Sequence, residues 1–273
     1  MISIIMPVWN GARFMDRAIA SVIAQTVPNW ELLIVDDGST DDSFQRASRW
    51  QELVNSHLGE EKIRLFRTEG SNSGMAIGCN LAAQRARYDV FAYLHQDDLF
   101  FPRRVESLLP YFEKYDLVFA PYEILENGKL TLWNIKSLCE KQPLTLGSNL
   151  LLQQPSFEVW VKTTLQSNNL SVPLGVAHRR TIFNDTGGFQ PGITCATEGV
   201  LWRRIVDRGA RIAFCPVIAG RYIVRPDSQA RMRRPFSIPC FEIDKKHPLG
   251  ANGQYLDAEW FAALEQKKLA KEK

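Results

Sequence analysis

The residues best suited to chemistry in this chain are an acidic run at the end of an apolar segment. Residues 91–94 read Phe-Ala-Tyr-Leu, and His95, Gln96, Asp97 and Asp98 follow directly. Two adjacent carboxylates beside an imidazole are costly to bury unless a positive group compensates their charge. Carboxylate oxygens and imidazole nitrogens are both ligands of divalent metals. The run therefore predicts a divalent metal at this point of the chain.

A second acidic pair ends another β-rich run. Residues 31–35 read Glu-Leu-Leu-Ile-Val and lead into Asp36 and Asp37, which Gly38, Ser39 and Thr40 follow. If both runs are strands of one parallel sheet, their carboxyl ends lie at the same edge. The two acidic ends can then share one pocket.

The elements that must position these groups alternate in type up to residue 121. Short β-branched runs predict strands near 2–6, 31–35, 63–67, 89–94 and 116–120. Apolar residues at helical spacing predict helices over 14–23, 41–56, 74–87, 102–114 and 197–208. This alternation is typical of an α/β, Rossmann-like fold with a mixed, mostly parallel sheet flanked by helices.

Polar clusters follow each of the first four predicted strands, at 7–10, 36–40, 69–74 and 95–98. One such cluster is an ordinary loop, but four in phase predict a binding crevice outside the carboxyl ends of the strands. The loop after the first strand lacks the glycine-rich phosphate motifs of dehydrogenases and P-loop proteins. We therefore expect that a metal, and not backbone amides of this loop, binds any phosphate here.

Composition indicates an ordinary globular protein. The chain has 273 residues, 45% of them hydrophobic, and a formal net charge of +3. This charge predicts no nucleic-acid binding, and the arginines crowded between 221 and 234 favour a local anion site. Five irregularly spaced cysteines predict neither a disulfide framework nor a zinc site. With no signal-like or membrane-spanning run, we expect a cytoplasmic protein. Its lysine-rich tail, 264–273, forms a solvated helix or touches an acidic membrane surface.

Six segments between residues 2 and 225, in sequence order, resemble the family 2 glycosyltransferases of the GT-A fold. They are Ile-Ile-Met-Pro-Val-Trp-Asn at 4–10, Val-Asp-Asp-Gly-Ser-Thr-Asp at 35–41, Asn72-x-Gly74 with Asn80, Leu-His-Gln-Asp-Asp at 94–98, Gly-Gly-Phe at 187–189, and Thr197-Glu198 with Leu201, Trp202 and Arg204. The resemblance implies an inverting transferase that moves a sugar from a nucleoside-diphosphate sugar to an acceptor hydroxyl, in polysaccharide or glycoconjugate synthesis.

The resemblance also divides the chain. Residues 1–121 would bind the nucleotide sugar, and 122–225 would form the acceptor-side half of the same GT-A domain. Residues 226–273 would be a C-terminal extension. The expected acceptor is a carbohydrate or a lipid-linked molecule.

The resemblance implies a role for each residue that matches a family motif. The residues expected at the donor nucleotide sugar are Pro7, Val8, Trp9, Asn10, Asp36, Asp37, Asn72, Gly74, Asn80, His95, Gln96, Asp98 and Arg225. The Trp9 ring would stack on the nucleotide or pack as a core aromatic. Either Asp36 or Asp37 would accept hydrogen bonds from the base or ribose, while the other caps the next helix. Asp97 would be the principal ligand of Mn²⁺ or Mg²⁺, and Asp98 would bind the donor sugar or cap a helix.

Three departures from the family pattern change these expectations. His95 replaces the first carboxylate of the usual Asp-x-Asp-Asp, and would ligate the metal or bond a phosphate or ribose hydroxyl. Glu198-Gly199 replaces the usual Glu-Asp pair, so Glu198 would be the catalytic base or a helix cap, with Asp185 and Asp207 as poorer substitutes. Arg225 replaces a frequent histidine, and would bind the diphosphate and supplement or partly replace the metal.

A frequent arginine is also missing, because Cys79 takes its position. Arg67, Arg225 or Arg231 would supply the lost charge. Two other functions stay open. One is a nucleotide-sugar-binding protein without transfer activity, because two motifs each lack a carboxylate. The other is a nucleotidyltransferase, for whose glycine-rich loop Asn10-Gly11-Ala12-Arg13 is a poor match. The motifs specify neither the donor nucleotide, nor the acceptor, nor the oligomeric state.

Overall fold

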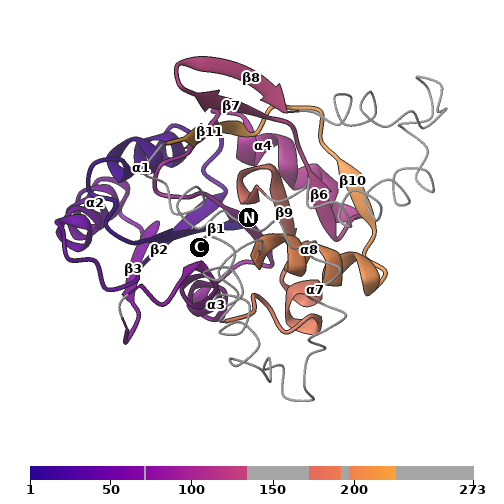
Figure 1. The fold of residues 1–273 in the computed structure, drawn as a ribbon, viewed down its shortest axis with the longest axis horizontal. Coiled ribbons are helices and arrows are strands. Elements are labelled where there is room, and N and C mark those ends of the chain that lie inside the picture. The colour runs from indigo at the N-terminus through magenta and orange to yellow at the C-terminus, as the bar shows by residue number, and fades with distance from the viewer. Residues whose placement is uncertain (71, 134–171, 192–196, 226–273) are drawn as a thin grey trace, which may run out of the picture.

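The computed structural model describes residues 1–70, 72–133, 172–191 and 197–225. Within them the largest element is a seven-stranded sheet of order β10-β6-β9-β4-β1-β2-β3 (Figure 1). Strands β1 (Ile2–Val8), β2 (Trp30–Asp36), β3 (Ile63–Arg67) and β4 (Val90–Tyr93) are parallel neighbours. β6 (Leu117–Phe119) and β10 (Ile212–Phe214) are also parallel, and β9 (Val176–Arg179) runs antiparallel between β4 and β6. The predicted mixed, mostly parallel sheet is confirmed.

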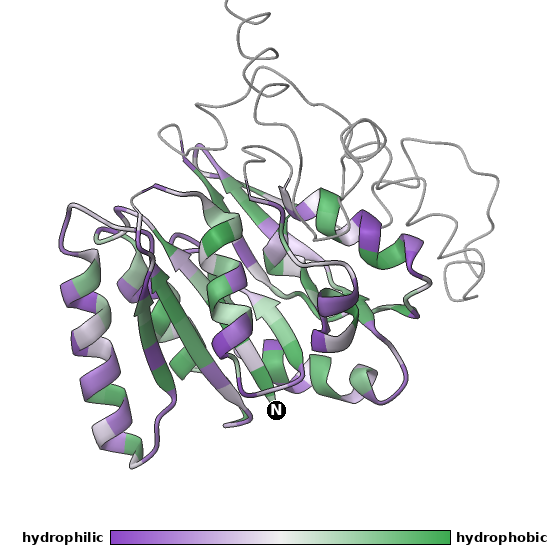
Figure 2. Cartoon of the chain, turned by 90° about the horizontal axis from the view of Figure 1, so that it is seen from below, coloured by the Kyte–Doolittle hydropathy of each residue, from purple (hydrophilic) through white to green (hydrophobic). Residues whose placement is uncertain are grey.

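Helices cover both faces of this sheet, because the strands bury hydrophobic side chains on both sides. One face packs against α1 (Met15–Ile23), α2 (Ser43–Leu58) and α4 (Arg104–Leu108). The other packs against α3 (Met75–Arg85), α7 (Arg180–Asp185) and α8 (Thr197–Asp207). Figure 2 shows the largely hydrophobic strands lying between helices of mixed character.

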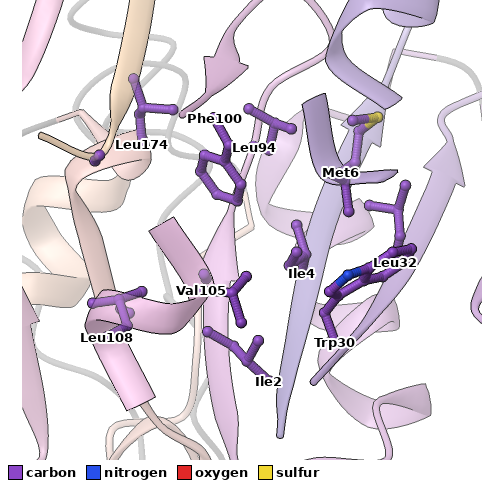
Figure 3. Packing of buried hydrophobic residues seen from close by; sticks show 14 of the residues in the cluster. Ile2, Ile4, Met6, Trp30, Leu32, Leu94, Phe100, Val105, Leu108 and Leu174 are labelled. Atoms are coloured by element: carbon purple, nitrogen blue, oxygen red, sulfur yellow. The ribbon is translucent and has the colours of Figure 1, made fainter. Parts of the chain in front are cut away.

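The core alternates along β1 as a two-sided strand requires. Ile2, Ile4 and Met6 pack on the first face, whereas Ile5 packs on the second. Figure 3 shows these three residues along β1, with Trp30 and Leu32 of β2 on one side and Val105 and Leu108 of α4 on the other. Because β1 is buried on both faces, its sequence is almost entirely apolar.

The helical segment predicted over 102–114 is divided in the structure. α4 ends at Leu108, and the 3-10 helix η1 (Leu109–Glu113) continues the chain. Pro110 lies in the first turn of η1. Proline has no amide hydrogen to donate to the carbonyl four residues earlier, so α-helical bonding stops there. The other strands and helices predicted up to residue 121 are confirmed within a few residues of their ends.

A second sheet, which the sequence did not lead us to expect, joins distant segments. Its order is β5-β11-β7-β8, from β5 (Leu99–Phe100), β11 (Gly220–Val224), β7 (Tyr122–Glu126) and β8 (Lys129–Trp133). β7 and β8 form a hairpin that turns at Asn127 and Gly128, both with positive φ. A short 3-10 helix, η3 (Pro173–Gly175), precedes β9. The antiparallel pairing of β5 with β11 brings residues near 98 next to residues near 223.

The proposed division of the chain at residue 121 stays a prediction. Strands from both sides of this position contribute to each of the two sheets. The proposed extension, 226–273, lies outside the described residues, and so do Arg231 and the lysine-rich tail. Within the described ranges, no helix combines the length and the hydropathy needed to cross a bilayer.

The pairing of β11 with β5 requires glycine at position 220. A Cβ there would lie 2.0 Å from the carbonyl oxygen of Leu99. We expect Gly220→Ala to lower the free energy of unfolding by roughly 2 kcal/mol, since the two strands must move apart. Urea denaturation measures this change.

Gly78→Ala is the matched control. A Cβ at Gly78 would contact Pro7 and Val35 at ordinary distances of 3.5 to 3.8 Å. Because alanine favours the helix, α3 should gain up to about 1 kcal/mol. An equal loss of stability in both variants would show that the Leu99 contact is not the cause.

Candidate active site

The polar clusters lie at one edge of the sheet because β1 to β4 run parallel. Backbone hydrogen bonds continue the pairing beyond the strands. The amide of Asp37 donates to the Val8 carbonyl at 2.7 Å, and the amide of Thr68 donates to the Asp36 carbonyl at 3.0 Å. The amide of Leu94 donates to the Ile5 carbonyl at 3.0 Å. The loops carrying the predicted site residues are thus neighbours.

Gln96 fastens the loop after β4 to the loop after β1. The Trp9 amide donates to Gln96 Oε1 at 2.9 Å, and Gln96 Nε2 donates to the Trp9 carbonyl at 3.0 Å. Gly11 leaves room for this pair, since a Cβ there would lie 2.3 Å from Oε1. The indole Nε1 of Trp9 is buried and has no hydrogen-bond partner among the described residues. Trp9 therefore has one donor group without a protein partner in the described ranges, whereas the side-chain amide of Gln96 bonds the Trp9 backbone.

Asn10 joins the loops after β1 and β2. It has a positive φ of 48°, a conformation that asparagine tolerates better than most residues. Its amide donates to Ser39 Oγ at 2.9 Å, and its Oδ1 accepts from the Thr40 amide at 2.8 Å. Pro7 and Val8 end β1 immediately before this loop.

Asp37 holds the loop that leads into α3. Its buried carboxylate accepts hydrogen bonds from Thr68 Oγ1 at 2.8 Å and from the Gly74 amide at 2.9 Å. Its carbonyl accepts from the amide of Asn72 at 2.8 Å. Asn72 and Gly74, both with positive φ, are therefore placed by Asp37.

Asp36 has a different partner. Its buried carboxylate lies 3.0 Å from Nε of Arg67, and the Arg67 guanidinium covers the Phe44 ring at 4.8 Å. At the start of α2 the amide of Ser43 donates instead to Asp41, at 3.0 Å. The capping role expected for Asp36 or Asp37 is wrong, because the N-cap residue of α2 is Asp42 and no side-chain capping bond forms there among the described residues. The expected bond from one of the pair to a nucleobase or ribose stays a prediction.

The acidic run divides into groups with separate partners. Asp98 is buried, and its Oδ1 accepts from the Ile223 amide at 3.0 Å, which fixes β11 to this loop. Burial, together with the neighbouring Asp97, raises the pKa of Asp98 well above its ordinary value. Asp97 Oδ2 accepts two hydrogen bonds from Arg225, from Nε at 3.0 Å and from Nη2 at 2.9 Å.

His95 lies beside the start of α3. Its Nε2 is 3.1 Å from the Sδ atom of Met75. Burial lowers the pKa of His95, although nearby Asp97 opposes this shift. A neutral imidazole is the form that ligates a metal or accepts a hydrogen bond.

Asp97 and His95 do not form a metal site by themselves. Among the described residues, no three His, Cys, Asp or Glu side chains gather closely enough to hold an ion. Hard divalent ions such as Mg²⁺ are nevertheless bound through one or two carboxylates together with substrate phosphate oxygens. The residues present therefore fit an ion whose coordination a bound diphosphate completes.

Glu198 lies on the other face of the sheet, in the first turn of α8. Burial raises its pKa from the ordinary value of 4.5 to about 7. Its charge also contributes to the raised pKa of the Cys79 thiol of α3, although burial is the larger cause. Glu198 and Cys79 are thus close enough to interact.

Asn80 positions the Gly-Gly-Phe turn instead of extending from α3 as an open polar group. Its Nδ2 donates to the Phe189 carbonyl at 2.7 Å, and its Oδ1 accepts from the Phe189 amide at 3.0 Å. Gly188 must lack a Cβ here, because one would lie 2.8 Å from Asn80 Oδ1. The role expected for Asn80 at the nucleotide sugar stays a prediction.

Sequence reasoning missed three residues that contact the site. Phe14 lies under Arg225, Met75 contacts His95, and Asp41 bonds the start of α2. The apolar spacing had assigned Phe14 only to a helix face. No local signal marks Met75, since its contact with His95 joins α3 to the loop after β4.

The family model described as glycosyl transferase family 2 matches residues 3–164, more than half of the chain. The chain therefore belongs to glycosyl transferase family 2, and the resemblance in the motifs is confirmed.

Curated relatives carry related names. The putative glycosyltransferase EpsE of Bacillus subtilis is 31% identical over 238 residues, which cover 86% of this chain and 77% of that protein. An uncharacterized glycosyltransferase of Nostoc is 36% identical over 222 residues, covering 81% of this chain and 60% of the relative. An uncharacterized glycosyltransferase of Rickettsia prowazekii is 31% identical over 140 residues, 50% of this chain but only 41% of the relative. The chain thus spans less than half of that Rickettsia protein.

Solved structures share the fold. TarS 1–349 of S. aureus in complex with UDP-GlcNAc gives a TM-score of 0.63 at 16% identity, covering 85% of this chain and 61% of that one. The mannosyltransferase PcManGT from Pyrobaculum calidifontis, in complex with GDP-Man and Mn²⁺, gives a TM-score of 0.59 at 15% identity. The match covers 84% of this chain and 58% of that one. At this identity the likeness shows the fold alone, and the predicted GT-A fold is confirmed.

The raised pKa of Glu198 predicts a pH-dependent stability. The folded protein holds the Glu198 proton up to about pH 7, whereas the unfolded chain releases it near 4.5. The stability from the protonated form is fully present below 4.5 and is lost as the pH rises through about 7. We expect Glu198→Gln, which cannot ionise, to become more stable relative to the wild type as the pH is raised over this range.

Urea midpoints of both proteins at several pH values measure this difference. Glu52→Gln, at an exposed position of α2, is the control and should follow the wild type. Parallel pH curves for Glu198→Gln and the wild type would contradict the raised pKa.

Proposed function

We propose that this chain is an inverting glycosyltransferase that moves a sugar from a nucleoside-diphosphate sugar to an acceptor hydroxyl. One observation carries the proposal. In a family 2 glycosyltransferase domain, burial at the start of α8 raises the pKa of Glu198 to about 7. A carboxylate with this pKa can accept a proton near neutral pH and does so more readily than an exposed one.

The donor binds at the carboxyl ends of β1 to β4. The orphaned indole donor of Trp9 and the closely linked loops after β1, β2 and β3 support this placement. The complexes of TarS with UDP-GlcNAc and of PcManGT with GDP-Man support a nucleotide sugar as the ligand class. The acceptor is a carbohydrate or a lipid-linked molecule, as expected for polysaccharide or glycoconjugate synthesis.

In the reaction, Glu198 removes the proton from the acceptor hydroxyl as its oxygen attacks the anomeric carbon. The new carbon–oxygen bond forms on the face opposite the diphosphate, whose bond to the sugar breaks with both electrons leaving on the phosphate oxygen. The proton ends on Glu198, and the configuration at the anomeric carbon is inverted. A divalent ion held by Asp97 and His95, when bound, would stabilise the charge of the leaving diphosphate as a Lewis acid.

The proposed setting is the cytoplasm, with contact at the inner membrane surface through residues 264–273. The reducing environment indicated by the irregular cysteines supports the first part. The basic composition of the tail supports the second.

Removing the carboxylate of Glu198 should separate transfer from donor binding. We expect Glu198→Gln to lower kcat at least about 100-fold, because the acceptor proton loses its base. Thermal stabilisation by the donor nucleotide should be unchanged. Wild-type activity should fall as the pH drops through about 7, where Glu198 takes up a proton.

Asp207→Asn is the matched control, since Asp207 lies at the opposite end of the same helix and pairs with Arg203. Full activity in Glu198→Gln would show that Glu198 is not the catalytic base. Tight nucleotide-sugar binding with no transfer to any tested acceptor would instead indicate a binding protein.

A further inference from the structure

The carboxylate expected to hold a metal already holds a guanidinium. Arg225 donates two hydrogen bonds to a single oxygen of Asp97, at 3.0 and 2.9 Å. The two side chains are only 18% and 17% exposed, so solvent screens the pair poorly. Hydrogen bonds between ionised groups in such surroundings are among the stronger ones in proteins.

Three elements hold Arg225 in this position. Its guanidinium carbon lies 3.8 Å from the centre of the Phe14 ring at the start of α1, a cation–π contact. Arg225 follows β11 directly, and β11 is fixed by the bond from the Ile223 amide to Asp98. β11 also pairs with β5, which follows the acidic run. The position is therefore built into the fold, unlike that of a long surface side chain.

A divalent cation at Asp97 meets this positive charge at close range. Two cations within a few ångströms of one carboxylate repel each other, so the ion must displace Arg225 or share its oxygen at a cost. A diphosphate changes this balance, because it offers Arg225 several anionic oxygens that match its planar fork. Arg225 can then leave Asp97 without losing its charge partner.

We propose that Arg225 and a divalent cation compete for Asp97, and that a nucleoside diphosphate releases Asp97 for the cation by attracting Arg225 to its own oxygens. The second half of this statement rests on the proposed function. The consequence is ordered binding: the ion alone binds weakly, and the ion and the diphosphate each strengthen the other. Arg225 thereby keeps the site free of metal until a donor is present.

The test is the affinity of the free protein for Mn²⁺ alone. It is measured by the loss of the electron paramagnetic resonance signal of the free ion, and by the rise in Tm that binding produces. We expect Arg225→Gln to bind Mn²⁺ at least about tenfold more tightly than the wild type, since Asp97 becomes an uncompensated carboxylate. The double variant Asp97→Asn with Arg225→Gln should lose this gain.

Arg221→Gln is the matched control. Arg221 lies on β11, and it pairs with Glu123 at 2.7 Å in the way that Arg225 pairs with Asp97. This control should bind Mn²⁺ as the wild type does. If Arg225→Gln does not fold, Arg225→Met replaces it, because methionine keeps an unbranched apolar stem against Phe14 but carries no charge. It should bind Mn²⁺ more tightly than the wild type.

Arg225→Gln with an unchanged or weaker affinity for Mn²⁺ would overturn the competition, and so would the absence of measurable binding in both proteins. A wild type that Mn²⁺ alone stabilises as much as Mn²⁺ with UDP or GDP would overturn the ordered binding. The proposed function fails separately, if no nucleoside diphosphate stabilises the wild type with or without the ion. In that case the Mn²⁺ comparison still decides the competition for Asp97.

Discussion

Parallel pairing of β1 with β2 and β4 is the constraint on which the rest of the structure depends. In this register Val8 lies opposite Asp36, so the loops after both strands begin at the same edge of the sheet. The polar residues that directly follow β1, β2 and β4 are placed by this edge. Hydrophobic burial on both faces holds β1 in the sheet, and the buried hydrogen bond from Ser3 Oγ to Glu31 of β2, at 2.7 Å, fixes the register.

Side-chain amides make two loops rigid by forming hydrogen bonds with their backbone groups. The amide of Gln96 bonds both backbone groups of Trp9, and the amide of Asn80 does the same for Phe189. Each pair removes freedom from a loop before any ligand arrives, which lowers the entropy lost on binding. Gln96 and Asn80, two polar residues of the family motifs, thus hold neighbouring segments in place.

How far the sequence could predict the structure follows from the range of each interaction. Strands and helices were predictable because apolar periodicity is local, and the shared edge followed because the alternation implied parallel strands. The hydrogen bonds between Asp97 and Arg225 join residues 128 positions apart, and no pattern within either segment predicts them. The family resemblance predicts Arg225 at a diphosphate, but it could not show that Asp97 binds the guanidinium. The β5 and β11 pairing was missed for the same reason, since β5 has only two residues.

The acidic run at the end of β4 illustrates how a fold can compensate buried charge with its own groups. Burial raises the pKa of Asp98 and so favours its neutral acid, while Asp97 binds the guanidinium of Arg225. The raised pKa of Asp98 and the ion pair of Asp97 with Arg225 together leave little net negative charge at the two adjacent carboxylates. A bare acidic pair would repel an anionic diphosphate, and a metal would be needed before the donor could approach. Because the protein supplies the compensation itself, the order can be reversed: the anion approaches first and makes the carboxylate available to the cation.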